Sequence, residues 1–350
     1  MQTSLLTTLD KTWTLRQGSL WSQVAGLTAI DYPRDDHLVL VKNKIFLNRL
    51  KAVMSSYHPW PKMGLVLEDA FWPEVKDDQE LQKMFSLVAT VASIPRFVLT
   101  TSYSFYQENM QPWVENFFSQ TGFEGHLDPT AKISPKAVVS PLAAIGQQVI
   151  IEDDVRIFPH VTIMPKSYIA RGTWIFPNVT IYPKVLIGKN CRIHSGTVIG
   201  GDGFGYQFVD GKHQKIWHSG GVIMEDEIEV GANTAIDAGT FSPTIIRSGT
   251  KIDNLVQVAH NCQLGENVLM CGQAGIAGSV HLDNYVVMGG KAGSAPDVHI
   301  GVGAQVAGNA MVSGNVEAGA QVAGHPARPL KEWLRSLAFL RRQCRQNKEL

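Results

Sequence analysis

An aliphatic residue recurs at every sixth position through much of this chain. An α-helix would show a period of 3.6 residues and an ordinary strand a period of two, so neither explains the pattern. A six-residue period, with one aliphatic residue followed by small or turn-forming residues, is typical of a hexapeptide β-helix. The first run holds an aliphatic residue at every step: Leu127, Ile133, Val139, Ile145, Ile151, Ile157, Ile163, Ile169, Ile175, Ile181, Ile187, Ile193 and Ile199.

The repeat predicts a triangular coil. Each hexapeptide forms one short strand and one corner, so three hexapeptides complete a coil. The aliphatic side chain points inward and stacks on its counterpart in the next coil, about 4.8 Å away along the axis. Gly, Asn, Asp and Pro suit the corners because they adopt a positive or a fixed φ. The predicted fold class is therefore mainly β, a left-handed parallel β-helix.

The phase of the repeat breaks after Ile199. Residues 200–221 are polar and aromatic, which predicts a loop extruded from the β-helix. The repeat resumes in a new register, and the two runs together predict about ten coils. Thr234, Thr240 and Ser294 are weak core positions in that register, which is Val222, Ile228, Thr234, Thr240, Ile246, Ile252, Val258, Leu264, Met270, Ile276, Leu282, Met288, Ser294, Ile300, Val306 and Val312.

Both ends of the chain lack the six-residue pattern. Residues 1–115 are interpreted as a small α/β domain, with strands expected at 37–41, 64–68 and 96–101 and helical or mixed segments at 44–55 and 103–119. The β-helix is expected over 127–322 and a helix over 329–350. This last helix carries an apolar stripe, which needs a covering surface and favours a cyclic homotrimer. The stripe consists of Leu330, Trp333, Leu334, Leu337 and Leu340.

Composition removes several classes of function. Lys plus Arg equals Asp plus Glu at 31 each, so net charge gives no reason to expect a nucleic acid partner. No apolar run approaches the ~20 residues of a membrane span, and the N-terminus lacks the pattern of a signal peptide. The four cysteines form no Cys-x-x-Cys pair, and the histidines are not clustered as metal ligands. We therefore expect a cytoplasmic protein with free thiols, without a metal or a cofactor of its own.

The densest group of polar residues lies in segment 251–279. Asp253 and His260 are seven residues apart. We expect this spacing to place them diagonally on adjacent coils, where the carboxylate could orient the imidazole. An oriented imidazole is a suitable general base for an amine or hydroxyl that attacks a thioester. Gly272, Gly275 and Gly278 offer bare backbone, from which an N–H could stabilise an oxyanion. A corner histidine bonded only to solvent remains the alternative for His260.

Several motifs, taken together, identify a resemblance. They are GGDGFGY (200–206), EIEVGANTAID (227–237), KIDNLVQVAHN (251–261), GQAGIAGS (272–279) and GHPARPLKEWLR (324–335). In this combination the chain resembles the UDP-3-O-acylglucosamine N-acyltransferases of lipid A biosynthesis. The resemblance is close over about residues 127–345. It is fainter in the N-terminal domain, where LVLVKNKIFLNRL (38–50) takes the place of the family's uridine-binding segment.

The resemblance implies a homotrimer that transfers a 3-hydroxyacyl chain. The donor would be acyl carrier protein and the acceptor the 2-amino group of UDP-3-O-acylglucosamine. Matched to the family's motifs, His260 would be the general base, Asp253 its orienting carboxylate and Gly278 the oxyanion donor. The substrate-binding positions would be Asn43 and Phe46 at the uracil, and Asp202, Phe204 and Tyr206 in the loop that borders the nucleotide-sugar.

Three positions depart from the family's pattern. Leu40 stands where the family usually has an aromatic residue, Ala238 where it has arginine, and Asp297 where it has a second histidine. Two alternatives therefore stay open. One is another nucleotide-sugar acyltransferase, including the O-acylating sister enzyme, which lacks the N-terminal domain. The other is a catalytically weakened binding or scaffold protein, against which the Asp253/His260 pair argues.

Overall fold

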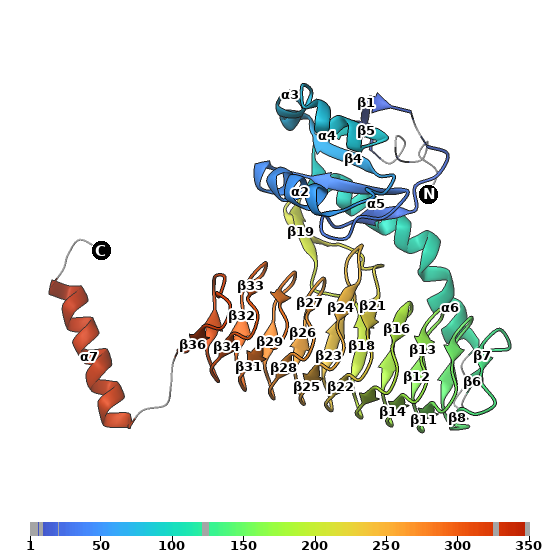
Figure 1. Cartoon of the computed structure of the whole chain (residues 1–350), viewed down its shortest axis with the longest axis vertical. Coiled ribbons are helices and arrows are strands. Elements are labelled where there is room, and N and C mark those ends of the chain that lie inside the picture. Colours follow the sequence, from blue (N-terminus) through green and yellow to red (C-terminus); the bar gives the residue numbers. More distant parts are fainter. Residues whose placement is uncertain (1–5, 7–9, 20, 121–125, 325–328, 347–350) are drawn as a thin grey trace.

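The computed structural model describes residues 6, 10–19, 21–120, 126–324 and 329–346. Within the helices, the side chains of residues 118–120, 333 and 344–346 are outside the description. An α/β unit lies beside a long β-helix, and a C-terminal helix lies beyond the last coil (Figure 1). The predicted mainly β class, built around a left-handed parallel β-helix, is confirmed.

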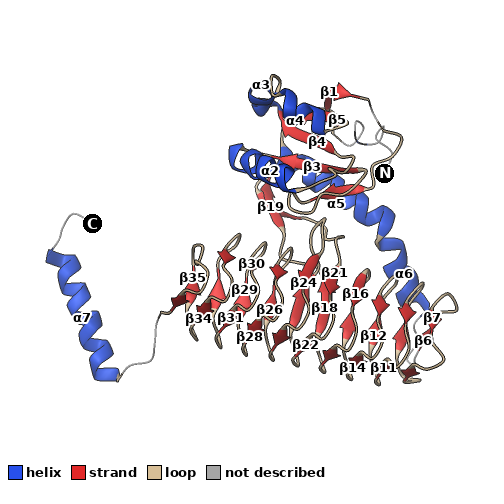
Figure 2. Cartoon of the chain, viewed as in Figure 1, coloured by secondary structure: helices blue, strands red, loops and turns tan. Residues whose placement is uncertain are grey.

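The β-helix has three flat faces of parallel strands (Figure 2), and nine or ten strands on each face make about ten coils. The first face contains β6 (His126–Leu127), β9 (Ala144–Ile145), β12 (Thr162–Ile163), β15 (Thr180–Ile181), β18 (Val198–Gly201), β23 (Ala235–Asp237), β26 (Gln257–Val258), β29 (Gly275–Ile276), β32 (Gly293–Ser294) and β35 (Met311–Val312). The second contains β7 (Lys132–Ile133), β10 (Ile150–Ile151), β13 (Tyr168–Ile169), β16 (Val185–Ile187), β21 (Val222–Met224), β24 (Thr244–Ile246), β27 (Gln263–Leu264), β30 (His281–Leu282) and β33 (His299–Ile300). The third contains β8 (Val138–Val139), β11 (Arg156–Ile157), β14 (Trp174–Ile175), β17 (Arg192–Ile193), β22 (Glu229–Val230), β25 (Lys251–Ile252), β28 (Leu269–Met270), β31 (Val287–Met288), β34 (Gln305–Val306) and β36 (Gln321–Val322).

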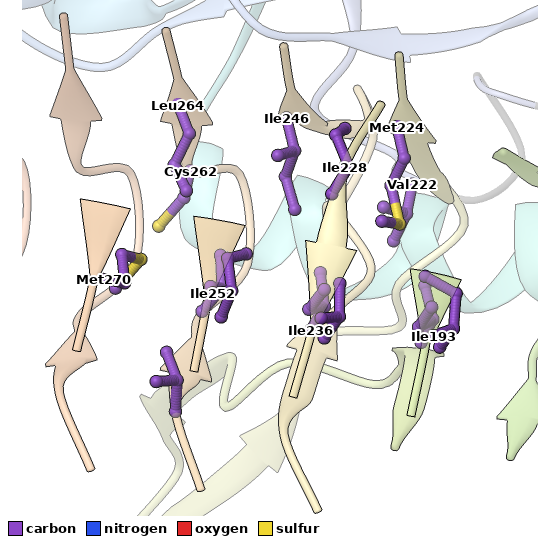
Figure 3. Packing of buried hydrophobic residues seen from close by; sticks show 14 of the residues in the cluster. Ile193, Val222, Met224, Ile228, Ile236, Ile246, Ile252, Cys262, Leu264 and Met270 are labelled. Atoms are coloured by element: carbon purple, nitrogen blue, oxygen red, sulfur yellow. The ribbon is translucent and has the colours of Figure 1, made fainter. Parts of the chain in front are cut away.

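The predicted aliphatic positions form the core of the β-helix. Ile157, Ile175 and Ile193 are hydrogen-bonded neighbours in register on the third face, and all three are buried. The apolar side chains of successive coils stack on one another in the interior (Figure 3), and Ser294 is a buried polar member of the inward row, between Ile276 and Val312. Burying one such side chain contributes about 1.5–3 kcal/mol, so the repeat stabilises the solenoid coil by coil.

The register expected between residues 222 and 240 is wrong. The inward strand positions there are Met224, Val230 and Ile236, which pair with the aliphatic row of the preceding coil. Residues 239–243 are an insertion that bulges outward, and the core row resumes at Ile246. Thr240 therefore lies outside the core. Val222, Ile228 and Thr234 are buried just before the strand positions, which explains why they fit an apolar pattern.

The N-terminal unit has a five-stranded sheet in the order β1-β5-β4-β3-β2, with only the edge strand β1 antiparallel. Its sheet lies between two apolar clusters, one around α5 and one around α2. The strands are β1 (Thr14–Gly18), β2 (Gly26–Thr28), β3 (His37–Val41), β4 (Gly64–Glu68) and β5 (Leu87–Val91). The helices are α2 (Lys44–Ser56), the 3₁₀ turn η1 (Asp69–Phe71), α3 (Trp72–Val75), α4 (Gln79–Met84), α5 (Ile94–Asn109) and α6 (Gln111–Gln120).

The expected strand at 96–101 is wrong, because this segment belongs to α5. Pro95 in the first turn is compatible with a helix start, where its missing N–H is not needed. Ile94, Phe97 and Val98 are buried at helical spacing, and the same face continues to Phe105. The expected strands at 37–41 and 64–68 are present as β3 and β4.

The predicted excursion at 200–221 contains a hairpin that contacts the N-terminal unit. Its strands are β19 (Tyr206–Val209) and β20 (Lys212–Lys215), which pair antiparallel. Tyr106 on α5 packs against Trp217, which follows β20, and their ring centroids lie 4.3 Å apart. Arg96, also on α5, donates a hydrogen bond of 2.6 Å to Asp210 at the tip of the hairpin. The excursion therefore fixes the N-terminal unit against one side of the β-helix.

The C-terminal helix α7 (Leu330–Gln346) stands apart from the coils (Figure 1). Its Leu330, Leu334 and Leu340 side chains are all more than half exposed. Part of the predicted apolar stripe is thus uncovered in the single chain. Among the described helices, none is both long and apolar enough to cross a membrane.

Candidate active site

A cavity of about 390 Å³ lies between the N-terminal unit and the β-helix. It opens along the corner that links the first face to the second, which we call the first corner. His260 and Asn261 occupy this corner between β26 and β27. Three parts of the fold line the cavity: the N-terminal unit (Thr28, Ala29, Ile30, Asp31, Tyr32, Leu40, Lys42, Phe46, Arg49, Ile94, Pro95, Val98), the excursion (Gln207, Ile216) and the β-helix (Thr240, Phe241, Ser242, Pro243, His260, Asn261, Gln263, Ser279, Val280, His281, Asp297).

The insertion at 239–243 fixes the Asn261 side chain. The backbone N–H of Thr240 donates to Asn261 Oδ1 at 3.1 Å, and Asn261 Nδ2 donates to the Ser242 carbonyl at 3.1 Å. These two backbone partners determine which end of the amide is the oxygen. Asn261 itself adopts a φ of 60°, a left-handed conformation that asparagine tolerates. The amide oxygen is therefore held in one place.

The Asn261 oxygen selects the tautomer of His260. His260 Nδ1 lies 3.1 Å from Asn261 Oδ1. An amide oxygen can only accept, so a hydrogen bond here places the proton of the neutral imidazole on Nδ1. Nε2 then carries a free lone pair. This is the form of histidine that a general base requires.

Gly278 lies directly against the His260 ring, one coil further along the first corner. A Cβ at Gly278 would lie 2.6 Å from His260 Cε1 and 2.7 Å from Nε2, so only glycine leaves the ring in place. The Gly278 carbonyl accepts from the Asp297 N–H at 3.1 Å. Its own N–H has no acceptor within the described part of the chain. The predicted neighbours His260 and Gly278 are thus brought together.

The predicted pairing of Asp253 with His260 is wrong. Strands three hexapeptides apart stack, as Lys251 pairs with Leu269, so residues seven apart lie on successive corners of one coil. Asp253 follows β25, accepts from the Asn254 N–H at 2.7 Å, and lines a separate groove with His194 and Cys271. It cannot orient His260 within this chain.

Asp237 is the carboxylate that can take the role predicted for Asp253 beside His260. The sequence analysis did not predict this residue. Asp237 ends β23, the strand that stacks on β26 just before His260. Burial raises the pKa of Asp237, while the hydrogen bond from Gln257 Nε2 at 2.9 Å and the charge of His260 oppose that rise. Counting back one coil from His260, which is 22 residues once the insertion is included, reaches Ala238, the residue directly after Asp237.

Phe46 reaches the cavity from the N-terminal unit. Lys42 Nζ lies 4.9 Å from the centroid of its ring, and Leu40 lines the same wall. Asn43 is not among the lining residues; its side chain accepts from the Phe46 N–H at 3.1 Å and caps α2. The structure therefore places Phe46 and His260 in one cavity, and gives Asn43 a structural contact.

The excursion residues predicted to border the nucleotide-sugar lie outside the cavity lining. Asp202 forms an ion pair with Lys215. Phe204 is 86% exposed, and its ring centroid lies 5.0 Å from that of Tyr206. Gln207 and Ile216 are the excursion residues that reach the cavity. Of the three departures from the family pattern, Leu40 and Asp297 line the cavity, while Ala238 is 5% exposed next to it.

Within the described residues, no group of three His, Cys, Asp or Glu side chains could hold a metal ion. His281 in the cavity wall has a lowered pKa, mainly because it is buried and also because His299 lies beside it. Its ring centroid is 5.4 Å from that of His299, which in turn bonds Asp283 at 2.9 Å.

Comparison with known proteins gives three kinds of match: a family model, solved structures and curated relatives. Residues 124–202 match the family model described as the GMPPB C-terminal domain. Solved structures with a similar arrangement include a UDP-N-acetylglucosamine acyltransferase from Campylobacter jejuni, which is 25% identical, has a TM-score of 0.42 and aligns over 53% of this chain and 68% of that one.

Curated relatives match more closely in sequence. UDP-3-O-acylglucosamine N-acyltransferase of Methylobacterium nodulans is 43% identical over 157 residues, which is 45% of either chain. The Wolinella succinogenes protein of the same name is 42% identical over 162 residues, or 46% of this chain and 51% of that one. The match thus spans about half the length of these relatives. Over that part, the predicted resemblance to UDP-3-O-acylglucosamine N-acyltransferases is confirmed.

Proposed function

We propose that this protein transfers a (3-hydroxy)acyl chain from acyl carrier protein to the 2-amino group of UDP-3-O-acylglucosamine, a step of lipid A biosynthesis. One observation carries the proposal: His260, with Nε2 free, lies against Gly278 in the cavity that also contains Phe46. A base, an unpaired N–H and an aromatic ring suited to a uracil are thereby available to one bound substrate. The similarity to the curated N-acyltransferases supports the same reaction.

The reaction follows from these positions. The amine nitrogen of the acceptor attacks the thioester carbonyl carbon, and its electron pair forms the new C–N bond. The carbonyl oxygen becomes an oxyanion, to which the Gly278 N–H can donate. Nε2 of His260 removes a proton from the nitrogen, the C–S bond breaks, and the imidazolium returns that proton to the departing sulfur. The products are an amide and the free thiol of the carrier.

Asn261 and Asp237 take the supporting roles in this scheme. Asn261 holds the Nδ1–H tautomer, which keeps Nε2 available as the base. Asp237 places a carboxyl group close enough for its pKa to respond to the charge of His260. A positive imidazolium is then less costly in the partly buried site. This pair replaces Asp253 in the proposal.

Substrate binding is assigned to the N-terminal unit and the excursion. Phe46 would stack on the uracil, with Asn43 beside it, and Lys42 would approach the phosphates. Asp202, Phe204 and Tyr206 would border the nucleotide-sugar after a movement of the excursion. Such a movement is needed because the Phe204 and Tyr206 rings are exposed to solvent. Leu40 in the cavity wall would give less stacking than an aromatic residue.

Assembly as a homotrimer is part of the proposal. The exposed leucines of α7 need a partner surface, and three copies of the helix could cover one another. Lys331, Arg335, Arg341 and Arg342 are exposed on α7 and would meet the acidic carrier protein. Light scattering of the purified chain tests the trimer, and a stable monomer at assay concentration would contradict it.

The decisive test is turnover of purified protein with acylated carrier protein and UDP-3-O-acylglucosamine. We expect an amide product, identified by mass spectrometry and by its resistance to hydroxylamine. An ester formed on UDP-N-acetylglucosamine would instead identify the O-acylating alternative. Tight binding of the nucleotide-sugar without turnover of either acceptor would identify the scaffold alternative.

A further inference from the structure

A second histidine lies behind the candidate base. His218 is on the segment that returns from the hairpin to β21, and it is 1% exposed. Neither of its ring nitrogens makes a hydrogen bond of normal geometry with the described residues. Buried polar atoms are nearly always paired, because an unpaired one is destabilising. A hydrocarbon side chain would fill this space more stably, so packing alone does not explain the imidazole.

His218 contacts two parts of the site, the His260 ring and the backbone of Gly203 and Gly205. Its ring centroid lies 5.2 Å from that of His260, with 64° between the ring planes. A Cβ at Gly203 would lie 2.8 Å from His218 Nε2 and 2.5 Å from His260 Cβ, and one at Gly205 would lie 2.8 Å from His218 Cε1. The backbone of the GDGFG motif therefore rests on both imidazoles, which explains its glycines.

His218 remains uncharged next to the base. Burial is the main cause that lowers its pKa to about 4, and the neighbouring His260 and Lys215 contribute. Asp202 and the Ile216 carbonyl oppose this effect only partly. Near neutral pH, His260 can thus accept a proton without a second cation beside it.

We propose that His218 is a positioning residue for the acyl transfer described above, on which this inference rests. Its uncharged imidazole holds the Gly203–Gly205 backbone and the His260 ring in the arrangement in which Nε2 of His260 faces Gly278. The ring sets their separation, because the Gly203 and Gly205 backbone and the His260 ring all lie against it. His218 itself touches no reacting atom.

The test combines kinetics with the state of His260. In the full chain with ¹⁵N-labelled histidine, NMR should show His260 as the Nδ1–H tautomer. In His218→Ala and His218→Phe, we expect a mixture of tautomers and a kcat reduced about 10-fold, with the KM for nucleotide-sugar unchanged. His218→Gln, which keeps a polar edge, should recover part of the kcat. His213→Ala, an exposed histidine of the same hairpin, is the matched control and should behave as wild type.

The proposal is overturned if His218→Phe is folded and keeps both the wild-type tautomer of His260 and the wild-type kcat, because His218 would then only fill space. It is also overturned if the variants raise KM in proportion to the loss of kcat/KM. Failure of the acyltransfer assay in the wild type is a different result, since the tautomer comparison needs no turnover. An unchanged tautomer in a folded His218→Ala then decides against the proposal by itself.

Discussion

The first corner of the β-helix has the same backbone conformation before and after the excursion, but its side chains have different roles in the two halves. Lys166 and Lys184 occupy its left-handed positions before the excursion, and Asn261, Ser279 and Asp297 occupy them after it, all with φ between 59° and 62°. Before the excursion the long cations reach outward to a helix. After it the short side chains leave a cavity.

The cations before the excursion hold α6. Lys166 Nζ lies 3.2 Å from the ring centroid of Trp113, and Lys184 Nζ lies 5.7 Å from it. Burial lowers the pKa of Lys184 to about 8, and the positive charges of Lys166 and Arg34 act in the same direction. This half of the corner is therefore occupied by the chain's own helix.

The residue before each left-handed position differs in the same way. It is Pro165 and Pro183 in the early coils and His260, Gly278 and Pro296 in the later ones, so the difference is found at the two corners that hold the candidate base and its glycine neighbour. Proline stiffens the corner, whereas the histidine–glycine pair places a base against bare backbone. One repeating scaffold can thus support an anchor and a reaction site, because the corner side chains do not alter the core.

The largest effect is expected from His260→Ala. Loss of a general base should lower kcat by at least about 10²-fold. The melting temperature and the affinity for nucleotide-sugar should stay near wild type, because His260 belongs to the corner and not to the core. Steady-state kinetics and thermal denaturation measure both. His160→Ala is the control, since His160 is an exposed corner residue with a φ of 60° in an early coil. Retention of most of the kcat in His260→Ala would place the base elsewhere.

Acid should destabilise the later half of the corner through His218. The pKa of His218, about 4, lies below the ~6.5 of a histidine in the unfolded chain. Between these two pH values the unfolded chain binds a proton at this residue and the native state does not. Stability present above pH 6.5 is lost as the pH falls toward 4, by up to about 3 kcal/mol from this group. Chemical denaturation at pH 7 and pH 4.5 should show a smaller loss for His218→Leu than for wild type. His37 and His281 also have lowered pKa values, so some loss remains. Equal losses in both proteins would contradict the assignment.

Gly278→Ala should move the base without removing it. The added methyl group would lie within 2.7 Å of the His260 ring, so the ring has to shift. A displacement of this kind lowers kcat by about 10- to 100-fold. Gly314→Ala is the control, because nothing lies within 4 Å of its Cβ position. If Gly278→Ala is fully active, the observed contact between this glycine and His260 has no role in catalysis.

Phe46→Ala should act on substrate binding alone. Loss of a stacking partner for the uracil should raise the KM for nucleotide-sugar about 10-fold and leave the KM for the acyl donor unchanged. Ile45→Ala removes a neighbouring side chain that is 76% exposed, and serves as the control. Equal changes in both KM values would mean that Phe46 supports the fold of the N-terminal unit, whose α2 cluster it contacts.

The sequence predicts the interior of the β-helix well because each inward position obeys one local rule. Ile145, Ile193 and Ile252 follow it and are buried. The insertion at 239–243 lengthens one coil, but a count by sixes from Val222 still arrives at the core residue Ile246. The six-residue period therefore does not reveal the insertion. In the N-terminal unit, RFVLTT is rich in residues that favour strands, but burial at helical spacing against the sheet overrides that preference.

The site was harder to predict, because its members come together through stacking at eighteen residues and through the excursion. The sequence predicts both His260 and Gly278, which are one coil apart and lie in contact. Spacing along the sequence favours Asp253, whereas Asp237 lies on the neighbouring coil of the same corner. No local pattern indicates that His218 returns from a hairpin to meet His260.

The smallest effect is expected in the anchoring half of the corner, from Lys166→Gln. This change keeps much of the side chain but removes the charge over Trp113, and a cation–π contact of this kind contributes about 1 kcal/mol. We expect the free energy of unfolding to fall by that amount, with kcat and both KM values unchanged. Lys291→Gln is the matched control, since Lys291 is an exposed corner lysine with a φ of 58°. A kcat that falls with Lys166→Gln would show that the two halves of the corner are coupled through α6. Unchanged stability would show that other contacts hold this helix, such as Phe117 where it approaches Gly146. Only a loss of stability without a loss of activity fits a corner whose two halves act independently.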